Sequence, residues 1–90
     1  MAGAVTAEAI EAEILQRTTE RGPGKSICPS EVARALAPEK WQPLMGPIRK
    51  AAAKLSAAGR IDILRKGKPI APDAIHGVIR LRIASGGNAE

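Results

Sequence analysis

Residues 48–66, IRKAAAKLSAAGRIDILRK, contain the clearest structural signal in the chain. In the first part of this stretch the apolar residues recur at helical spacing, so that Ile48 and Leu55 share one face of an amphipathic helix. After Gly59 the pattern changes to alternation of apolar and polar residues, which is typical of a half-buried strand. The stretch therefore predicts a helix that ends at Gly59 and a strand over residues 60–66.

A second alternating run follows at residues 77–83, where Ile79 and Leu81 alternate with arginines. We expect the strands at 60–66 and 77–83 to pair antiparallel and to place their apolar side chains against the helices. The segment between them, residues 67–76, is long and rich in proline. It therefore predicts an extended loop rather than a tight turn.

The chain before this region begins with a helix. Thr6 is a suitable N-cap for a helix over residues 7–20, whose buried stripe contains Ile10 and Ile14. A turn rich in glycine and proline ends this helix, and residues 25–27 are expected to be a short extended piece.

Prolines indicate where the next two helices begin. Pro29 suits the first position of a second helix, which we expect to end before Pro38. The start of the third helix stays open between Pro43 and Pro47. Trp41, just before it, is interpreted as a hydrophobic plug at the start of this helix; the alternative is an exposed stacking or interface residue.

The order helix, short strand, helix, turn, helix and hairpin is that of an α+β winged helix-turn-helix. The prediction is three helices with a two- to three-stranded antiparallel hairpin sheet. Residues 1–83 form one domain in this interpretation, and residues 84–90 form a disordered tail.

Five short motifs carry a resemblance to a known family: Ser26–Ala33, Trp41 with Leu44-Met45, Ile48-Arg49, Gly59-Arg60-Ile61 and Gly77–Leu81. Over about residues 25–83 the chain resembles a family of small, uncharacterised bacterial winged-helix proteins. The resemblance implies a winged-helix fold and brings no established activity.

Composition limits the class of function. Ninety residues with an aromatic fraction of 1% make a thin core, which disfavours a large enzyme cleft. The net charge is +5; residues 1–20 contribute −3 (one basic, four acidic), so the remainder carries +8 (13 basic less 5 acidic). Such a charge attracts polyanions or acidic proteins.

We expect a cytoplasmic protein without a membrane partner, because no apolar span is present and one cysteine cannot form an internal disulfide.

Catalysis, metals and cofactors are not expected. The run Gly24-Lys25-Ser26 ends like a phosphate-binding loop, but Thr19 occupies the position of the required first glycine. Cys28 and His76 are the single thiol and the single imidazole, too few for a four-ligand metal site.

Basic residues on the third helix and the hairpin are the main candidates for function. The set is Arg49, Lys50, Lys54, Arg65, Lys66, Lys68, Arg80 and Arg82. One interpretation is a solvated face. The other is double-stranded DNA binding, because a winged helix places both of these elements beside DNA.

In the DNA-binding interpretation, side chains of the third helix contact phosphates or bases, and the wing contacts the backbone. The expected DNA-binding residues are Lys40, Gln42, Arg49, Lys50, Lys54, Arg65, Lys66 and Lys68. The alternative is a protein–protein interaction or dimerisation module that does not bind DNA. The DNA sequence and the oligomeric state stay open.

Overall fold

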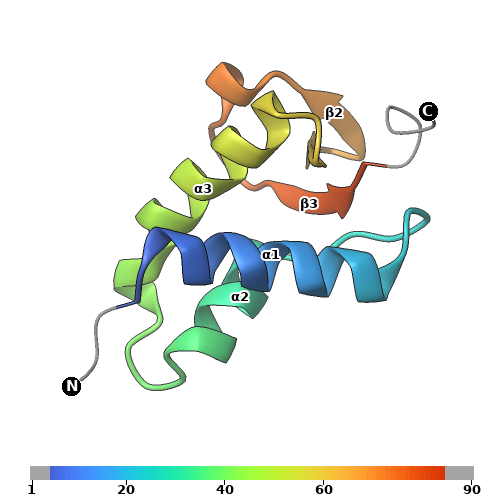
Figure 1. Cartoon of the computed structure of the whole chain (residues 1–90). Helices are drawn as coiled ribbons and strands as arrows, with labels where there is room; N and C mark the ends of the chain where they lie inside the picture. Colours follow the sequence, from blue (N-terminus) through green and yellow to red (C-terminus); the bar gives the residue numbers. More distant parts are fainter. Residues whose placement is uncertain (1–4, 85–90) are drawn as a thin grey trace.

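Three α helices and a three-stranded antiparallel sheet make up an α+β fold that is consistent with a winged helix (Figure 1). The computed structural model describes residues 5–84. The helices are α1 (Ala7–Arg21), α2 (Pro29–Leu36) and α3 (Met45–Ala57), and the strands are β1 (Ile61–Arg65), β2 (Lys68–Ile70) and β3 (Arg80–Ile83). Two 3-10 turns, η1 (Gln42–Leu44) and η2 (Pro72–Ala74), precede α3 and follow β2. Of the expected tail at 84–90, all but Ala84 lies outside the described residues.

Helix α1 begins and packs as its sequence predicts. The Oγ1 atom of Thr6 accepts a hydrogen bond from the backbone N–H of Ala9 at 3.1 Å and so caps the first turn. Ile10 and Ile14 are buried, and so is Thr18, which is 1% exposed. The Thr18 hydroxyl donates to the carbonyl of Ile14 at 2.8 Å, so this polar group has a partner inside the core.

Proline placement explains the starts of the other two helices. Pro29 is the first residue of α2, where a missing N–H costs no helical hydrogen bond. Pro47 is the third residue of α3, within the first turn, whose N–H groups also lack intrahelical acceptors. The helix therefore starts two residues before Pro47 and is preceded by the η1 turn.

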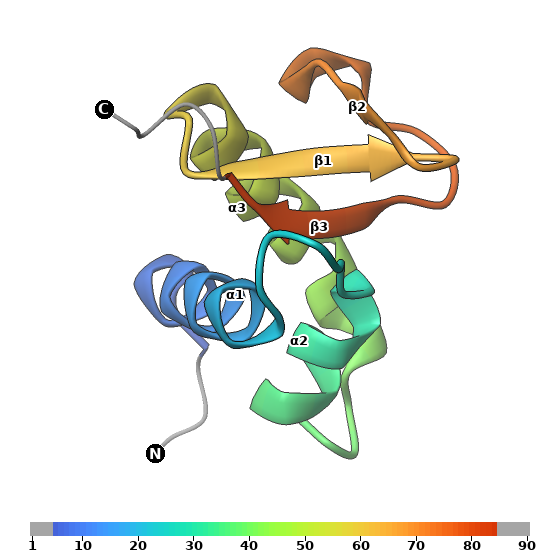
Figure 2. The same ribbon diagram turned by 90° about the vertical axis from the view of Figure 1, so that its right-hand side faces the viewer.

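The sheet has the strand order β2-β1-β3. The expected antiparallel pairing of the two main strands is confirmed, with Ile63 opposite Leu81 in the register. The extended piece at 25–27 is confirmed as well, because Ile27 forms an isolated bridge to Leu81 with two backbone hydrogen bonds of 2.8 Å. Figure 2 shows the sheet above α1 and α2, with α3 behind it.

The prediction of an extended loop over residues 67–76 is wrong for the first half of that segment, which contains strand β2. β1 turns directly into β2 through Lys66 and Gly67, and Arg65 pairs with Lys68. Both turn residues have positive φ, 54° and 82°, as two-residue turns matched to the twist of a hairpin require. Pro69 is tolerated because β2 is an edge strand. We call residues 65–79 the wing: they comprise the end of the β1–β2 hairpin, η2 and an irregular return to β3.

The core lies between the inner face of the sheet and the three helices. It is built mainly from isoleucines, and Ile14, Ile48 and Ile63 are all fully buried. Trp41 is only partly buried and packs at the edge of this core, with the guanidinium carbon of Arg34 4.6 Å from the ring centroid. Trp41 therefore packs against the core just before α3, at its edge rather than enclosed within it.

Candidate nucleic-acid interface

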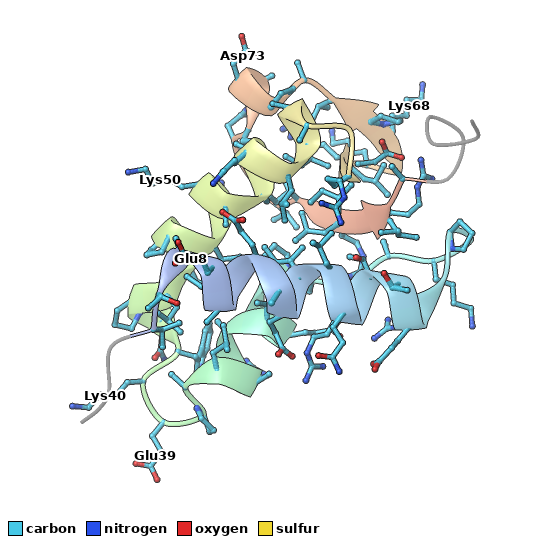
Figure 3. The ribbon with its side chains drawn as sticks, in the orientation of Figure 1. Glu8, Glu39, Lys40, Lys50, Lys68 and Asp73 are labelled. Carbon is cyan, nitrogen blue, oxygen red and sulfur yellow. The ribbon has the colours of Figure 1, made fainter. Side chains whose placement is uncertain are left out.

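Helix α3 presents its basic residues on two different flanks. Ile48, Ala52 and Leu55 are buried, as the spacing predicts, and Lys50 is exposed and projects away from the body of the protein (Figure 3). Lys54 lies on the flank nearest α1, where its Nζ atom pairs with the carboxylate of Glu11 at 3.1 Å. Part of the charge of Lys54 is therefore already compensated within the protein.

Arg49 lies on the other flank of α3 and links the helix to the wing. Its guanidinium donates a hydrogen bond to the carbonyl of Gly77, in the return segment before β3. The side chain of Arg65 packs against the same residue, since a Cβ atom at Gly77 would lie 3.4 Å from Arg65 Nε. Neither arginine has an ion-pair partner among residues 5–84. Two guanidinium groups thus meet where α3 and the wing join.

The remaining wing cations do not all lie on the α3 side. Lys66 is in the hairpin turn and Lys68 follows it on β2, and both are exposed. In Figure 3, Lys68 and Lys50 project from opposite sides of the molecule. A single flat surface therefore does not contain all the basic residues that the sequence grouped together.

Lys40 and Gln42 lie between α2 and α3 rather than on α3. Gln42 is in the η1 turn, and Lys40 projects from the preceding loop close to Glu39 (Figure 3). Both side chains are exposed. The structure does not bring Lys40 next to the wing.

Acidic residues border the α3 surface. Glu8 lies near the crossing of α1 and α3, and Asp73 projects from η2 (Figure 3). Together with Glu11, they give the neighbourhood of α3 a mixed charge.

The outer face of the sheet carries basic residues with fewer neighbouring carboxylates. Arg80 donates from Nε to the Ser26 hydroxyl at 2.7 Å and from Nη2 to the Ser26 carbonyl at 2.9 Å. Arg82 pairs with Asp62 at 2.8 Å. Val78, 83% exposed, stands two residues before Arg80. The alternation around Ile79 and Leu81 that predicted the strand also places these residues on the outer face, but the expected site did not include Val78 or Ser26.

The lone cysteine takes part in a helix cap. The backbone N–H of Cys28 donates to the Glu31 carboxylate at 3.0 Å, and its Sγ atom lies 3.0 Å from the Ser30 hydroxyl. Partial burial raises the pKa of Glu31, but the Cys28 hydrogen bond and the nearby guanidinium of Arg21, 2.9 Å away, outweigh it and lower that pKa overall.

Residues 5–84 contain neither a cluster of metal-binding side chains nor a membrane-spanning helix. Histidine, cysteine and carboxylate side chains form no group of three that could hold a metal ion there. In the same part of the chain, no helix is long and apolar enough to cross a membrane.

Comparison with known proteins gives a family but no activity. A comparison with curated proteins found no matching relative. A family described as "Protein of unknown function (DUF3253)" has a model that matches residues 7–84, from the start of α1 to just after β3. Because this match covers nearly all of the described fold, the chain belongs to the DUF3253 family of proteins of unknown function.

Proposed function

We propose that this chain is a winged-helix module that binds double-stranded DNA and catalyses no reaction. In this proposal α3 enters the major groove and the wing contacts the phosphate backbone. The observation that carries the proposal is the junction at Gly77, which joins Arg49 of α3 to the wing beside Arg65. A guanidinium has five N–H donors, so both arginines keep donors for phosphate oxygens.

The proposed contact set is narrower than the one expected from sequence. The proposed DNA contacts are Arg49 and Lys50 on α3, and Arg65 and Lys66 in the wing. Lys54 contributes less because Glu11 neutralises part of its charge. Lys68 is left out because it projects away from the side on which Lys50 lies.

The decisive experiment measures binding to a labelled random duplex by fluorescence anisotropy between 50 and 200 mM salt. Lys50→Gln and Lys66→Gln should each weaken binding about fivefold, roughly 1 kcal/mol, and reduce the salt slope by about one unit. Lys25→Gln is the matched control, because Lys25 is an exposed lysine in the loop after α1 and does not belong to the proposed contact set. The proposal is overturned if the wild-type chain shows no salt-sensitive affinity below about 100 μM, weaker than ordinary non-specific binding.

A protein-interaction module without DNA binding is the second candidate. The feature that favours it is a groove of about 400 Å³ between the start of α1 and α3, with an apolar floor that includes Ile10 and Ala51. Association through such a floor responds little to salt, unlike binding to phosphates. Sedimentation of the protein alone at 50 and 500 mM salt separates the two: salt-insensitive self-association favours the interaction module, and a monomer at both salt concentrations excludes dimerisation.

A further inference from the structure

A second candidate site lies at the wing end of the sheet, on its outer face. It is a cleft of about 430 Å³, which falls within the range of small-molecule pockets. Its lining includes three basic residues (Arg65, Lys66 and Arg80), two apolar side chains (Leu64 and Val78) and Ser26. Arg80 shares the outer face with its strand partner Leu64, whereas the guanidinium of Arg65, two residues after buried Ile63, lies against Gly77 on the other side of the sheet. Neither α3 nor α1 contributes to it.

The charge in this cleft is of one sign. No carboxylate lines it, and the ion pairs found in residues 5–84 do not include any of its three cations. The carboxylate of Glu31, which attracts Arg80 from outside the lining, is itself paired with Arg21 at 2.9 Å. Two cations, Lys66 and Arg80, that line the cleft without a counter-ion favour a doubly charged anion over a singly charged one.

Arg80 is held in place before any ligand arrives. Two of the five N–H donors of its guanidinium are used on Ser26, at 2.7 and 2.9 Å, which leaves three for a ligand. Ser26 is itself fixed, because the next residue, Ile27, is fully buried and bonded through its backbone to Leu81. A cation held by a rigid strand loses little conformational entropy on binding.

The apolar part of the cleft consists of one buried and one exposed side chain. Leu64 is 6% exposed and forms part of the floor, whereas Val78, at 83%, is the one large apolar side chain that is exposed in residues 5–84. A ligand that covers Val78 would remove this apolar surface from water. The cleft therefore matches a molecule with an apolar body and a doubly charged head.

We propose that this cleft binds the phosphate monoester of a small apolar or aromatic body. The phosphate contacts Arg80 and Lys66, and the body lies on Val78 and Leu64. No residue of this site comes from α3, so phosphate binding does not require that α3 bind DNA. Lys66 also belongs to the proposed DNA contact set, so a bound phosphate monoester competes with duplex DNA for it.

The test uses the full chain and follows backbone amide shifts during titration with phenyl phosphate, inorganic phosphate and benzoate. Phenyl phosphate should bind more tightly than either of the others, with shifts confined to the wing and the residues around Ser26. Arg80→Gln should weaken phenyl phosphate binding about tenfold, because it removes a charge-assisted contact. Val78→Ser should weaken it about threefold and leave inorganic phosphate unchanged, because it removes only the apolar contact.

Two matched variants keep the result interpretable. Arg60→Gln removes another exposed arginine, at the opposite end of β1 from the wing, and should change the affinity less than twofold. Lys66→Gln lies in an exposed turn and should weaken phenyl phosphate binding even if Arg80→Gln fails to fold.

The proposal is overturned if phenyl phosphate binds no better than inorganic phosphate, or if its shifts map to α3. Equal loss of affinity in Arg60→Gln and Arg80→Gln would also overturn it, as a sign of non-specific attraction to charge. Failure of the DNA experiment leaves this result unaffected, because no arm of the titration contains DNA. A separate competition experiment tests the shared use of Lys66: displacement of phenyl phosphate by duplex DNA supports it, and simultaneous binding of both contradicts it.

Discussion

Trp41 carries the single aromatic ring of the chain. The ring packs at the edge of the core and against Arg34, so its removal opens a site that water already reaches in part. We expect Trp41→Ala to lower the free energy of unfolding by about 2 kcal/mol, less than the 3–5 kcal/mol typical of a fully enclosed ring. Urea unfolding followed by circular dichroism measures this, with Trp41→Phe as the conservative variant. A loss above about 4 kcal/mol would mean that the ring is enclosed after all.

Glu31 gives a residue-scale prediction about pH. Its pKa is lower in the folded protein than its ordinary value of 4.5, so the folded state binds this proton less tightly than the unfolded chain does. The carboxylate therefore stabilises the fold above about pH 4.5, and this contribution is lost as the pH falls through the lower folded pKa. Glu31→Gln should cost about 1 kcal/mol at pH 7, because it weakens the α2 cap and the pairing with Arg21 in a partly exposed site.

Urea unfolding of wild type and Glu31→Gln at a series of pH values tests this dependence. The difference between the two proteins should shrink towards zero below pH 4.5. Glu39→Gln, an exposed carboxylate without an ion-pair partner in the described residues, is the control and should show no such convergence. A constant difference across the series would contradict the role given to the charge of Glu31.

At the scale of elements, the wing hairpin depends on the backbone of its two-residue turn. Gly67 has a φ of 82°, and a Cβ atom there would meet nothing within 4 Å, so the cost of a side chain is conformational rather than steric. Gly67→Ala should destabilise the protein by about 1 kcal/mol and speed amide exchange in β2 without affecting the β1–β3 pairing. Gly24→Ala, at an equally open loop position with no positive φ, should be close to neutral. Equal effects of the two variants would show that the turn conformation does not matter.

The same hairpin shows why sequence reasoning reached most of the fold but not all of it. Helices and the two main strands have apolar periods that burial imposes, so Ile48, Ile63 and Leu81 could be placed from spacing alone. The turn at Lys66 and Gly67 has no such period. Lysine rarely adopts a positive φ, so the sequence lacked the usual asparagine or aspartate signal for a two-residue turn.

The candidate site was less predictable than the fold, because burial imposes a regular spacing on apolar residues but not on charged residues at the surface. Helical spacing separates Lys54 from Arg49 by about 140° around α3, yet only the tertiary structure places Glu11 beside one and Gly77 beside the other. The cleft on the outer face of the sheet brings Ser26 next to Arg80, residues 54 positions apart in the chain. The contact between Ser26 and Arg80 results from the bridge between Ile27 and Leu81. The local sequence around Ile27 does not determine which strand it pairs with.

At the scale of the whole molecule, net charge should act in opposite directions on stability and on binding. Four of the fourteen cations form ion pairs within residues 5–84, which leaves ten to repel one another in a protein of net charge +5. Salt screens this repulsion, and the exposed ion pairs that it also weakens contribute little. We therefore expect the free energy of unfolding to rise by about 0.5–1 kcal/mol between 20 and 300 mM sodium chloride.

Over the same salt range the proposed DNA affinity should fall steeply, because the cations that repel one another in the free protein are neutralised by phosphates in the complex. Urea unfolding and duplex titration on one preparation measure both trends. A double variant, Lys66→Gln with Lys68→Gln, should gain a few tenths of a kcal/mol at 20 mM salt and show a flatter dependence of stability on salt, because both lysines are exposed in the wing. A stability that falls with salt would mean that ion pairs such as Lys54–Glu11 outweigh the repulsion. In that case repulsion among the cations would not destabilise the folded protein. Relief of that repulsion would then not contribute to binding of a polyanion at the wing.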